Sequence, residues 1–195
     1  MDIYIIILIL SYSVGSLPFG LILSRLGGLG DIRKIGSGNI GATNVFRKSK
    51  ALALLTLFLD STKGFIAVAL ANSYVPDKTF VFISALFSII GHIFPVWLLF
   101  KGGKGVATLL GSLVFIEYKL AICFLLSWIV IFTGFKYASL SSIISTAFIL
   151  LIICMHYEKD VSMVFLIISL LIIAQHINNI IRIIQGNENR VNIKL

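Results

Sequence analysis

Long apolar runs dominate the sequence and leave little polar chain between them. A transmembrane helix needs about 20 mostly apolar residues, and the runs of about that length are 3–24, 51–74, 79–100, 119–135, 137–155 and 161–183. Charged residues make up only 12% of the chain, about half of their share in soluble domains. A soluble fold of this composition would lack surface residues, so the sequence predicts an all-α polytopic membrane protein.

A further apolar run, residues 105–116, is too short for an ordinary span. A helix of this length reaches about 18 Å, so it is either a short span or a re-entrant helix buried in protein. If it spans, about 12 basic residues face the cytoplasm and about 3 face outward, whereas without it the division weakens to about 10 against 5. The positive-inside rule therefore predicts seven transmembrane helices, with the N-terminus outside and the C-terminus cytoplasmic.

The ends and the charge of the chain fit a single membrane domain over residues 1–195. No basic residue precedes the first apolar run and it carries no small-residue cleavage site, which favours a retained span over a signal peptide. The net charge is +8, and the basic residues flank the apolar runs. Basic residues in these positions are expected to set the membrane topology or to bind anionic ligands or lipid headgroups, rather than nucleic acid. Cys123 and Cys154 lie inside apolar runs, as packed or lipid-facing residues do.

Three polar stretches containing glycine, 25–50, 101–108 and 182–195, fall on the cytoplasmic face in this topology. The first contains "GSGNIGATNVFR". Its glycines allow close approach of backbone N–H groups to an anion, small polar side chains add hydrogen bonds, and an arginine can clamp a phosphate. An ordinary cytoplasmic loop is the alternative. The candidate binding residues here are Gly36, Ser37, Gly38, Asn39, Thr43, Asn44 and Arg47.

The second stretch, "KGGKGVAT", is a glycine turn that enters a helix. It is not a Walker A loop, because Leu99 stands where that loop has glycine and Gly105 follows the lysine in place of Ser or Thr. Backbone donors, a positive helix end and an ammonium group meet in such a turn, and this combination suits a phosphate. The candidates are Lys101, Gly102, Gly103, Lys104, Gly105 and Thr108.

The third stretch, residues 175–190, begins within the last apolar run and continues past its end. His176, Asn179 and Arg182 are spaced by three, which predicts a polar stripe on one side of a continuous helix that ends near Gly186. Such a stripe faces the bundle rather than lipid. It either joins helices or binds a substrate hydroxyl or phosphate.

Ionisable residues also occur within the apolar runs. Asp60 and Lys63 lie three apart, which predicts an internal ion pair that positions helices or, alternatively, contacts substrate. His92 precedes Pro95, which is expected to kink its helix. A packed, hydrogen-bonded histidine is the simpler interpretation of His92.

Three motifs in this order, "GSGNIGATNVFR", "GHIFPVWLLFKGGKGVAT" and "HINNIIRIIQGNE", together with "GSLPFG" near the N-terminus, resemble the bacterial acyl-phosphate:glycerol-3-phosphate acyltransferases. The resemblance covers essentially the whole chain. It implies a seven-helix enzyme of the bacterial cytoplasmic (inner) membrane with its active site on the cytoplasmic face. The implied reaction moves a fatty acyl group from acyl-phosphate to the 1-hydroxyl of sn-glycerol 3-phosphate. Its products are lysophosphatidic acid and phosphate, in phospholipid biosynthesis.

The resemblance also implies roles for individual residues. Ser37 and Arg47 are expected to be needed for activity, His176 and Asn179 to be important, and the loop of Gly102, Gly103, Lys104 and Gly105 to bind acyl-phosphate. Gln175 replaces the basic residue that usually precedes the histidine, which removes one auxiliary phosphate contact.

The chemistry agrees with the composition. Acyl-phosphate is already activated, so positioning and charge neutralisation suffice. Arg47, Lys104 and Arg182 are the candidate cations. We expect no cofactor and no metal, because acidic residues are few and form no ligand cluster, and we expect a monomer to be functional. Ser37 is interpreted as a binding residue rather than an acylated nucleophile. The hydroxyl proton goes to His176 or to a substrate phosphate.

Two alternatives come from other functional classes. A transporter of an anionic phosphorylated metabolite would also use basic motifs, but the motifs lie on one face and no repeated halves are visible. An acyltransferase with another donor would carry an H-x-x-x-x-D motif, whereas Trp97, Val161 and Ile181 stand five residues after the three histidines.

Overall fold

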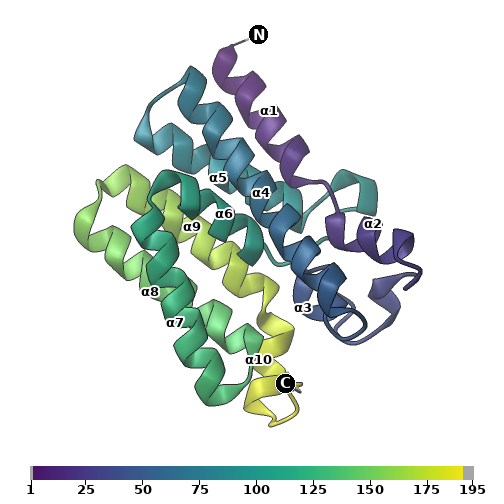
Figure 1. Cartoon of the computed structure of the whole chain (residues 1–195). Coiled ribbons are helices and arrows are strands. Elements are labelled where there is room, and N and C mark those ends of the chain that lie inside the picture. The colour runs from purple at the N-terminus through teal and green to yellow at the C-terminus, as the bar shows by residue number, and fades with distance from the viewer. Residues whose placement is uncertain (1, 191–195) are drawn as a thin grey trace. The chain divides into compact units, whose positions relative to one another are not determined.

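The computed structural model describes residues 2–190, and over these residues every long element is a helix, with no β-strand (Figure 1). This confirms the all-α prediction for the described part of the chain. The chain divides into two compact units, unit 1 (Met1–Ile116) and unit 2 (Glu117–Leu195).

Unit 1 holds the helices that follow from the first three long apolar runs and the short one. They are α1 (Ile3–Gly15), α2 (Phe19–Leu26), α3 (Ala42–Val45), α4 (Lys50–Tyr74), α5 (Lys78–Ile93) and α6 (Val106–Ile116), with the 3₁₀ turns η1 (Ile32–Lys34) and η2 (Val96–Leu98). Ser49 and Asp77 cap α4 and α5 by accepting N–H groups of their first turns. Pro18 separates α1 from α2. Pro95 was expected to kink its helix, whereas α5 ends at Ile93 and Pro95 leads into η2.

Glycines allow the helices of unit 1 to approach closely. A Cβ at Gly64 on α4 would lie 2.1 Å from Thr108 O, and a Cβ at Gly111 on α6 would lie 1.8 Å from Ser61 O. The two helices therefore touch backbone to backbone. Gly15 and Gly91 make the same kind of contact between α1 and α5. Small residues at helix crossings are the usual device of membrane bundles, where lipid tails weaken the hydrophobic drive between helices.

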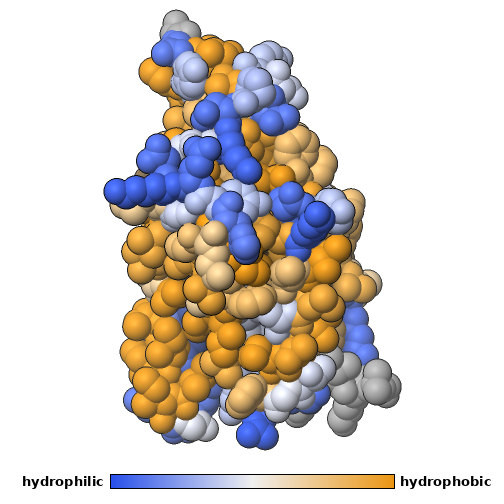
Figure 2. Space-filling model, turned by 90° about the vertical axis from the view of Figure 1, so that its left-hand side faces the viewer, coloured by the Kyte–Doolittle hydropathy of each residue, from blue (hydrophilic) through white to orange (hydrophobic). Residues whose placement is uncertain are grey.

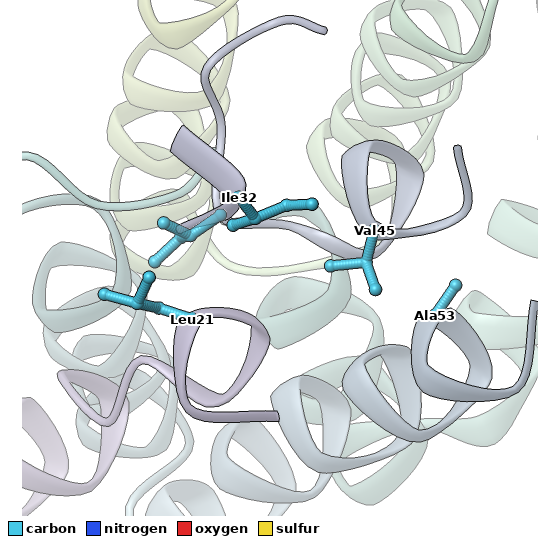
Figure 3. Packing of buried hydrophobic residues seen from close by; sticks show 5 residues of the cluster. Leu21, Ile32, Val45 and Ala53 are labelled. Atoms are coloured by element: carbon cyan, nitrogen blue, oxygen red, sulfur yellow. The ribbon is translucent and has the colours of Figure 1, made fainter. Parts of the chain in front are cut away.

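The polar connection from α2 to α4 has a small hydrophobic core of its own. The core consists of Leu21, Ile32, Ile40, Val45 and Ala53, all buried, and four of them are labelled in Figure 3. Leu98 of η2 packs against this cluster. The connection is thus a folded layer on α2 and the start of α4, and it adjoins the turn that leads to the glycine loop.

Unit 2 contains α7 (Tyr118–Phe135), α8 (Ala138–His156), α9 (Lys159–Gln175) and α10 (Ile177–Ile184). The predicted continuous last helix is wrong: α9 and α10 meet at an angle of 56°. The break is at His176, which ends α9 and begins α10. Gly186 follows α10 with a φ of 72°, as expected of a residue that terminates a helix.

Five helical segments among the described residues are long and apolar enough to cross a membrane, and α9 with α10 makes a sixth if the bent pair is one span. The short helix α6 is apolar but has 11 residues. Many large hydrophobic side chains are exposed, and Figure 2 shows hydrophobic residues over much of one face. Such a surface suits lipid rather than water. The seventh span and the orientation of the termini stay predictions.

Candidate active site

Asn44 organises the first polar stretch. Its side chain is buried, and its Nδ2 donates to the carbonyl oxygens of Ile32, Ile35 and Asn39, while its Oδ1 accepts the N–H of Ser37. The distances run from 2.8 to 3.1 Å. One amide thereby ties the loop to the start of α3. Every polar atom of this amide serves the loop, so the structure supports a positioning role for Asn44.

Gly36, Ser37 and Arg47 come together on this scaffold. Gly36 has a φ of 55°, and a Cβ there would lie 2.9 Å from Arg47 Nε and 2.3 Å from Asn44 Oδ1. The arginine side chain thus passes directly over the glycine that precedes Ser37 in the chain. Ser37 and Arg47 are both exposed. A hydroxyl and a guanidinium on a rigid loop can bind a phosphate.

Other predicted residues of this stretch are spread around the same loop. Gly38 is exposed and has a φ of 71°. Asn39 Oδ1 accepts the N–H of Gly41 at 2.8 Å, so it braces the turn into α3. Thr43 is exposed on α3. A substrate contact of these three residues stays a prediction.

The glycine loop, residues 101–105, caps α5. Gly103 N donates to His92 O at 2.9 Å, and Gly102 N donates to Ile93 O at 3.0 Å. These N–H groups satisfy carbonyls that the end of a helix leaves unpaired. Our sequence argument treated the glycine N–H groups as phosphate donors, and two of them have this different task. The backbone donors that suit an anion are those of the first turn of α6.

The turn before the glycine loop is held firmly to α1. Tyr12 OH donates to Phe94 O at 2.8 Å, and Trp97 Nε1 donates to Ser16 Oγ at 2.7 Å. Leu99 and Phe100 then adopt left-handed conformations, with φ of 52° and 61°. Two successive non-glycine residues in this region are uncommon. They turn the chain back so that the glycines reach the end of α5.

The remaining predicted residues of the second motif differ in exposure. Lys101 is exposed, Lys104 is half-buried and Gly105 is buried, with a φ of 85° that favours glycine. Thr108 is fully buried on α6, and its hydroxyl makes no hydrogen bond. Because Leu98 packs on the core below the first loop, unit 1 brings the first and second motifs near one another.

Glu188 is the centre of the third motif in unit 2. Its Oε1 accepts Asn179 Nδ2 at 2.6 Å and Ser139 Oγ at 2.8 Å, and its Oε2 accepts Arg182 Nε at 2.8 Å. The Glu188 side chain is 7% exposed. Burial alone would raise the pKa of Glu188, but the hydrogen bonds from Asn179, Arg182 and Ser139 outweigh it and lower the pKa. The carboxylate therefore stays charged.

His176 lies buried at the break between α9 and α10. Its Nδ1 lies 2.8 Å from Ile172 O. A carbonyl oxygen only accepts, so the neutral ring carries its proton on Nδ1 and Nε2 is the basic nitrogen. Because the chain bends at His176, the three residues do not form the straight stripe expected of one continuous helix.

Our sequence reasoning missed Glu188 and Ser139. Glu188 stands in the quoted motif "HINNIIRIIQGNE", but spacing along a helix says nothing about a residue after its end. The chain turns back at Gly186, and this turn brings the Glu188 carboxylate into contact with Arg182, six residues earlier. The sequence did contain one signal for this contact: an acidic residue stands two positions after the glycine that follows the helix of Arg182.

Comparison with known proteins identifies the family. The sequence profile described as glycerol-3-phosphate acyltransferase matches residues 5–186. A glycerol-3-phosphate acyltransferase of Ehrlichia canis is 67% identical over 191 residues, covering 98% of this chain and 100% of that protein. One from Mesorhizobium japonicum is 43% identical and covers 97% of each chain. These matches favour an acyltransferase over the transporter.

Two solved structures share the fold. One is PlsY (YgiH), an integral membrane glycerol 3-phosphate acyltransferase, in its glycerol 3-phosphate form. It superimposes with a TM-score of 0.93 at 38% identity, covering 98% of this chain and 96% of that chain. The lysophosphatidic acid form of the same enzyme gives a TM-score of 0.90 at 36% identity, with the same coverage. The chain described here therefore belongs to the glycerol-3-phosphate acyltransferase family and is an integral membrane acyltransferase.

Proposed function

We propose that the protein transfers a fatty acyl group from acyl-phosphate to the 1-hydroxyl of sn-glycerol 3-phosphate, releasing lysophosphatidic acid and inorganic phosphate. The hydroxyl oxygen forms the new ester bond to the acyl carbon, and the bond from that carbon to the phosphate oxygen breaks. The hydroxyl proton leaves to a base, and the leaving phosphate takes the electron pair. The observation that carries this proposal is the Arg47 side chain lying over Gly36, the neighbour of Ser37 in the chain, on a loop that Asn44 holds by hydrogen bonds.

Charge supports the proposal. The two substrates each bring a phosphate, and the reaction needs positive groups to hold them together. Arg47 is exposed beside Ser37, and Lys104 lies in the glycine loop before α6. Arg182 already gives its Nε to Glu188. We assign phosphate binding to Arg47 and Lys104 because of their places in the first and second motifs. We assign Arg182 to holding the end of α10 with Asn179, since both donate to Glu188.

His176 suits a role at the reacting hydroxyl. With the proton on Nδ1 directed to Ile172 O, Nε2 accepts a hydrogen bond from a substrate hydroxyl. His176 or a substrate phosphate takes the proton. In the first case the imidazole passes it on after the ester forms, and in the second case the substrates supply their own base.

The setting of the enzyme is also part of the proposal. Residues 1–195 act as one catalytic domain that includes both units and works as a monomer in the cytoplasmic membrane of a bacterium. All three motifs face the cytoplasm, which is where a water-soluble glycerol phosphate is available. The basic residues on the predicted cytoplasmic loops support this orientation.

An assay of the purified protein tests the reaction directly. The protein in lipid nanodiscs or detergent receives acyl-phosphate and glycerol 3-phosphate, and released phosphate and lysophosphatidic acid are measured together. We expect equal amounts of both. Acyl-CoA in place of acyl-phosphate serves as the control donor and should give no product. Transfer from acyl-CoA without any from acyl-phosphate would contradict the proposed donor.

A further inference from the structure

A buried charged pair on α4 lies below the glycine loop and takes no part in the proposed chemistry. Asp60 and Lys63 are each 2% exposed, and Asp60 Oδ1 lies 2.8 Å from Lys63 Nζ. This confirms the predicted ion pair. Lys63 Nζ also donates to Leu17 O at 2.9 Å. Leu17 precedes Pro18 at the break between α1 and α2, so the pair fastens α4 to that break.

His92 on α5 lies against this pair. Its Nδ1 is 3.7 Å from Asp60 Oδ1, too far for a hydrogen bond. This nitrogen is buried and makes no hydrogen bond, so the histidine is packed, as expected, but not hydrogen-bonded through Nδ1. The opposite edge of the ring presents Nε2 to the glycine loop.

That opposite edge supports Gly103. A Cβ at Gly103 would lie 1.9 Å from His92 Nε2 and 2.7 Å from His92 Cε1. The main chain makes a second contact, because Gly103 N donates to His92 O. The φ of Gly103 is outside the left-handed region, so an alanine could adopt its conformation. The three atoms nearest to such a Cβ all belong to the His92 ring, so the ring is the first obstacle to a side chain at this position.

We propose that His92 is a positioning residue for acyl transfer: its ring and its carbonyl set the place of the glycine loop, and the Asp60–Lys63 pair holds the ring. The proposal rests on the proposed function, because the place of this loop matters for turnover only if the loop holds a substrate phosphate. His92 itself touches the loop rather than the substrate. Position 103 is then glycine because the imidazole needs the space.

A double-mutant cycle between positions 92 and 103 tests the proposal. Gly103→Ala in the wild-type background displaces the loop, and we expect kcat/KM to fall by about 100-fold, the loss that a misplacement of about 1 Å can cause. In the His92→Ala background the clash is absent, and the same change should alter kcat/KM by less than about threefold. His92→Ala alone should raise the KM of a phosphate substrate more than it lowers kcat.

Equal losses from Gly103→Ala in both backgrounds would overturn the proposal, because they would mean that the glycine makes room for substrate rather than for His92. Gly134→Ala on α7 is the matched control, since a Cβ there meets nothing within 4 Å. It should keep the activity of the wild type. His92→Ser repeats the cycle if His92→Ala does not fold.

A spectroscopic measurement needs no change at position 92. The imidazole ¹⁵N resonances of His92, in protein labelled at histidine, should shift in Gly103→Ala and stay unchanged in Gly134→Ala. Unchanged resonances in Gly103→Ala would also overturn the proposal. The assay of the wild type distinguishes failure of the proposed function from failure of the role of His92. A wild type without acyl transfer contradicts the function. An active wild type in which the effects of changes at positions 92 and 103 are additive contradicts only the role of His92.

Discussion

At the scale of residues, single polar side chains hold whole stretches of chain in this enzyme. Asn44 gathers three carbonyls and one N–H of the first motif, and Glu188 gathers three side chains of the third. Both are buried groups with their hydrogen bonds made, which is the condition for a polar group to stabilise rather than destabilise. The residues offered to substrate, such as Arg47, lie on top of these frames.

Arg47→Ala should separate substrate binding from the fold. We expect kcat/KM for glycerol 3-phosphate to fall by about 100-fold or more, as when a donor to a reacting anion is removed, with an unchanged melting temperature. Arg47→Lys should recover only part, because an ammonium cannot make the two-pronged contact of a guanidinium. Lys48→Ala removes the same charge from the next position and should stay within about twofold of the wild type. Near-normal kinetics of Arg47→Ala would remove this residue from the site.

Glu188→Gln should destabilise the protein by about 1.5–3 kcal/mol, the range for a lost hydrogen bond to a charged group. The effect depends on pH with a definite sign. The pKa of Glu188 is lowered in the folded state from its usual 4.5, so its contribution is complete above about pH 4.5 and is lost as the pH falls through the lowered value.

Melting temperatures of the wild type and of Glu188→Gln at several pH values measure this contribution. The difference between the two should be constant at neutral pH and shrink below about pH 4.5. Glu158, whose side chain makes no capping hydrogen bond, offers the matched control Glu158→Gln, for which no such difference is expected. A gap that persists at low pH would show that Glu188 acts through packing alone.

At the scale of elements, the sequence predicts the helices well and their breaks less well. The apolar runs place α4, α7 and α8 within a residue or two, but α5 ends at Ile93, just before Pro95, where only a kink was predicted. Nothing in the run 161–183 announces the break at His176, because it contains neither proline nor glycine. Glycine contacts between helices are likewise invisible until the partner helix is known.

The close contact between α4 and α6 gives a prediction at this scale. Gly111→Ala would bring a Cβ to within 1.8 Å of Ser61 O, and we expect a loss of about 1–3 kcal/mol from overpacking. Thermal unfolding in detergent measures this. Gly134→Ala, with open space around it, should be neutral or slightly stabilising, because alanine favours helix over glycine. Equal stability of the two variants would mean that the helices can separate without loss.

At the scale of the whole molecule, composition and motif order predicted the membrane class, the all-α fold and the family. The first and second motifs proved to lie near one another in unit 1, which follows from the packing of Leu98 on the core of the first loop. That contact joins residues far apart in the chain, so no local pattern could predict it. The capping of α5 by the N–H groups of Gly102 and Gly103 could not be predicted from the sequence either.

Accessibility of introduced cysteines tests the topology. In a background with Cys123→Ala and Cys154→Ala, Lys48→Cys should react with an impermeant maleimide only in inside-out vesicles. Lys119→Cys, just after α6, should react only in right-side-out vesicles. Both positions are exposed. Reaction of both from the same side would mean that α6 does not span and that the positive-inside count misassigned the later helices.

The capping of α5 by Gly102 and Gly103 has a consequence for how the enzyme meets its substrates. Moving the glycine loop away would strand two carbonyl groups at the end of a mostly buried helix, where water cannot easily replace the lost N–H partners. The amide protons of both glycines should therefore exchange slowly with deuterium whether or not ligand is bound. Recognition would then proceed by capture on a preformed surface, without a lid that opens and shuts.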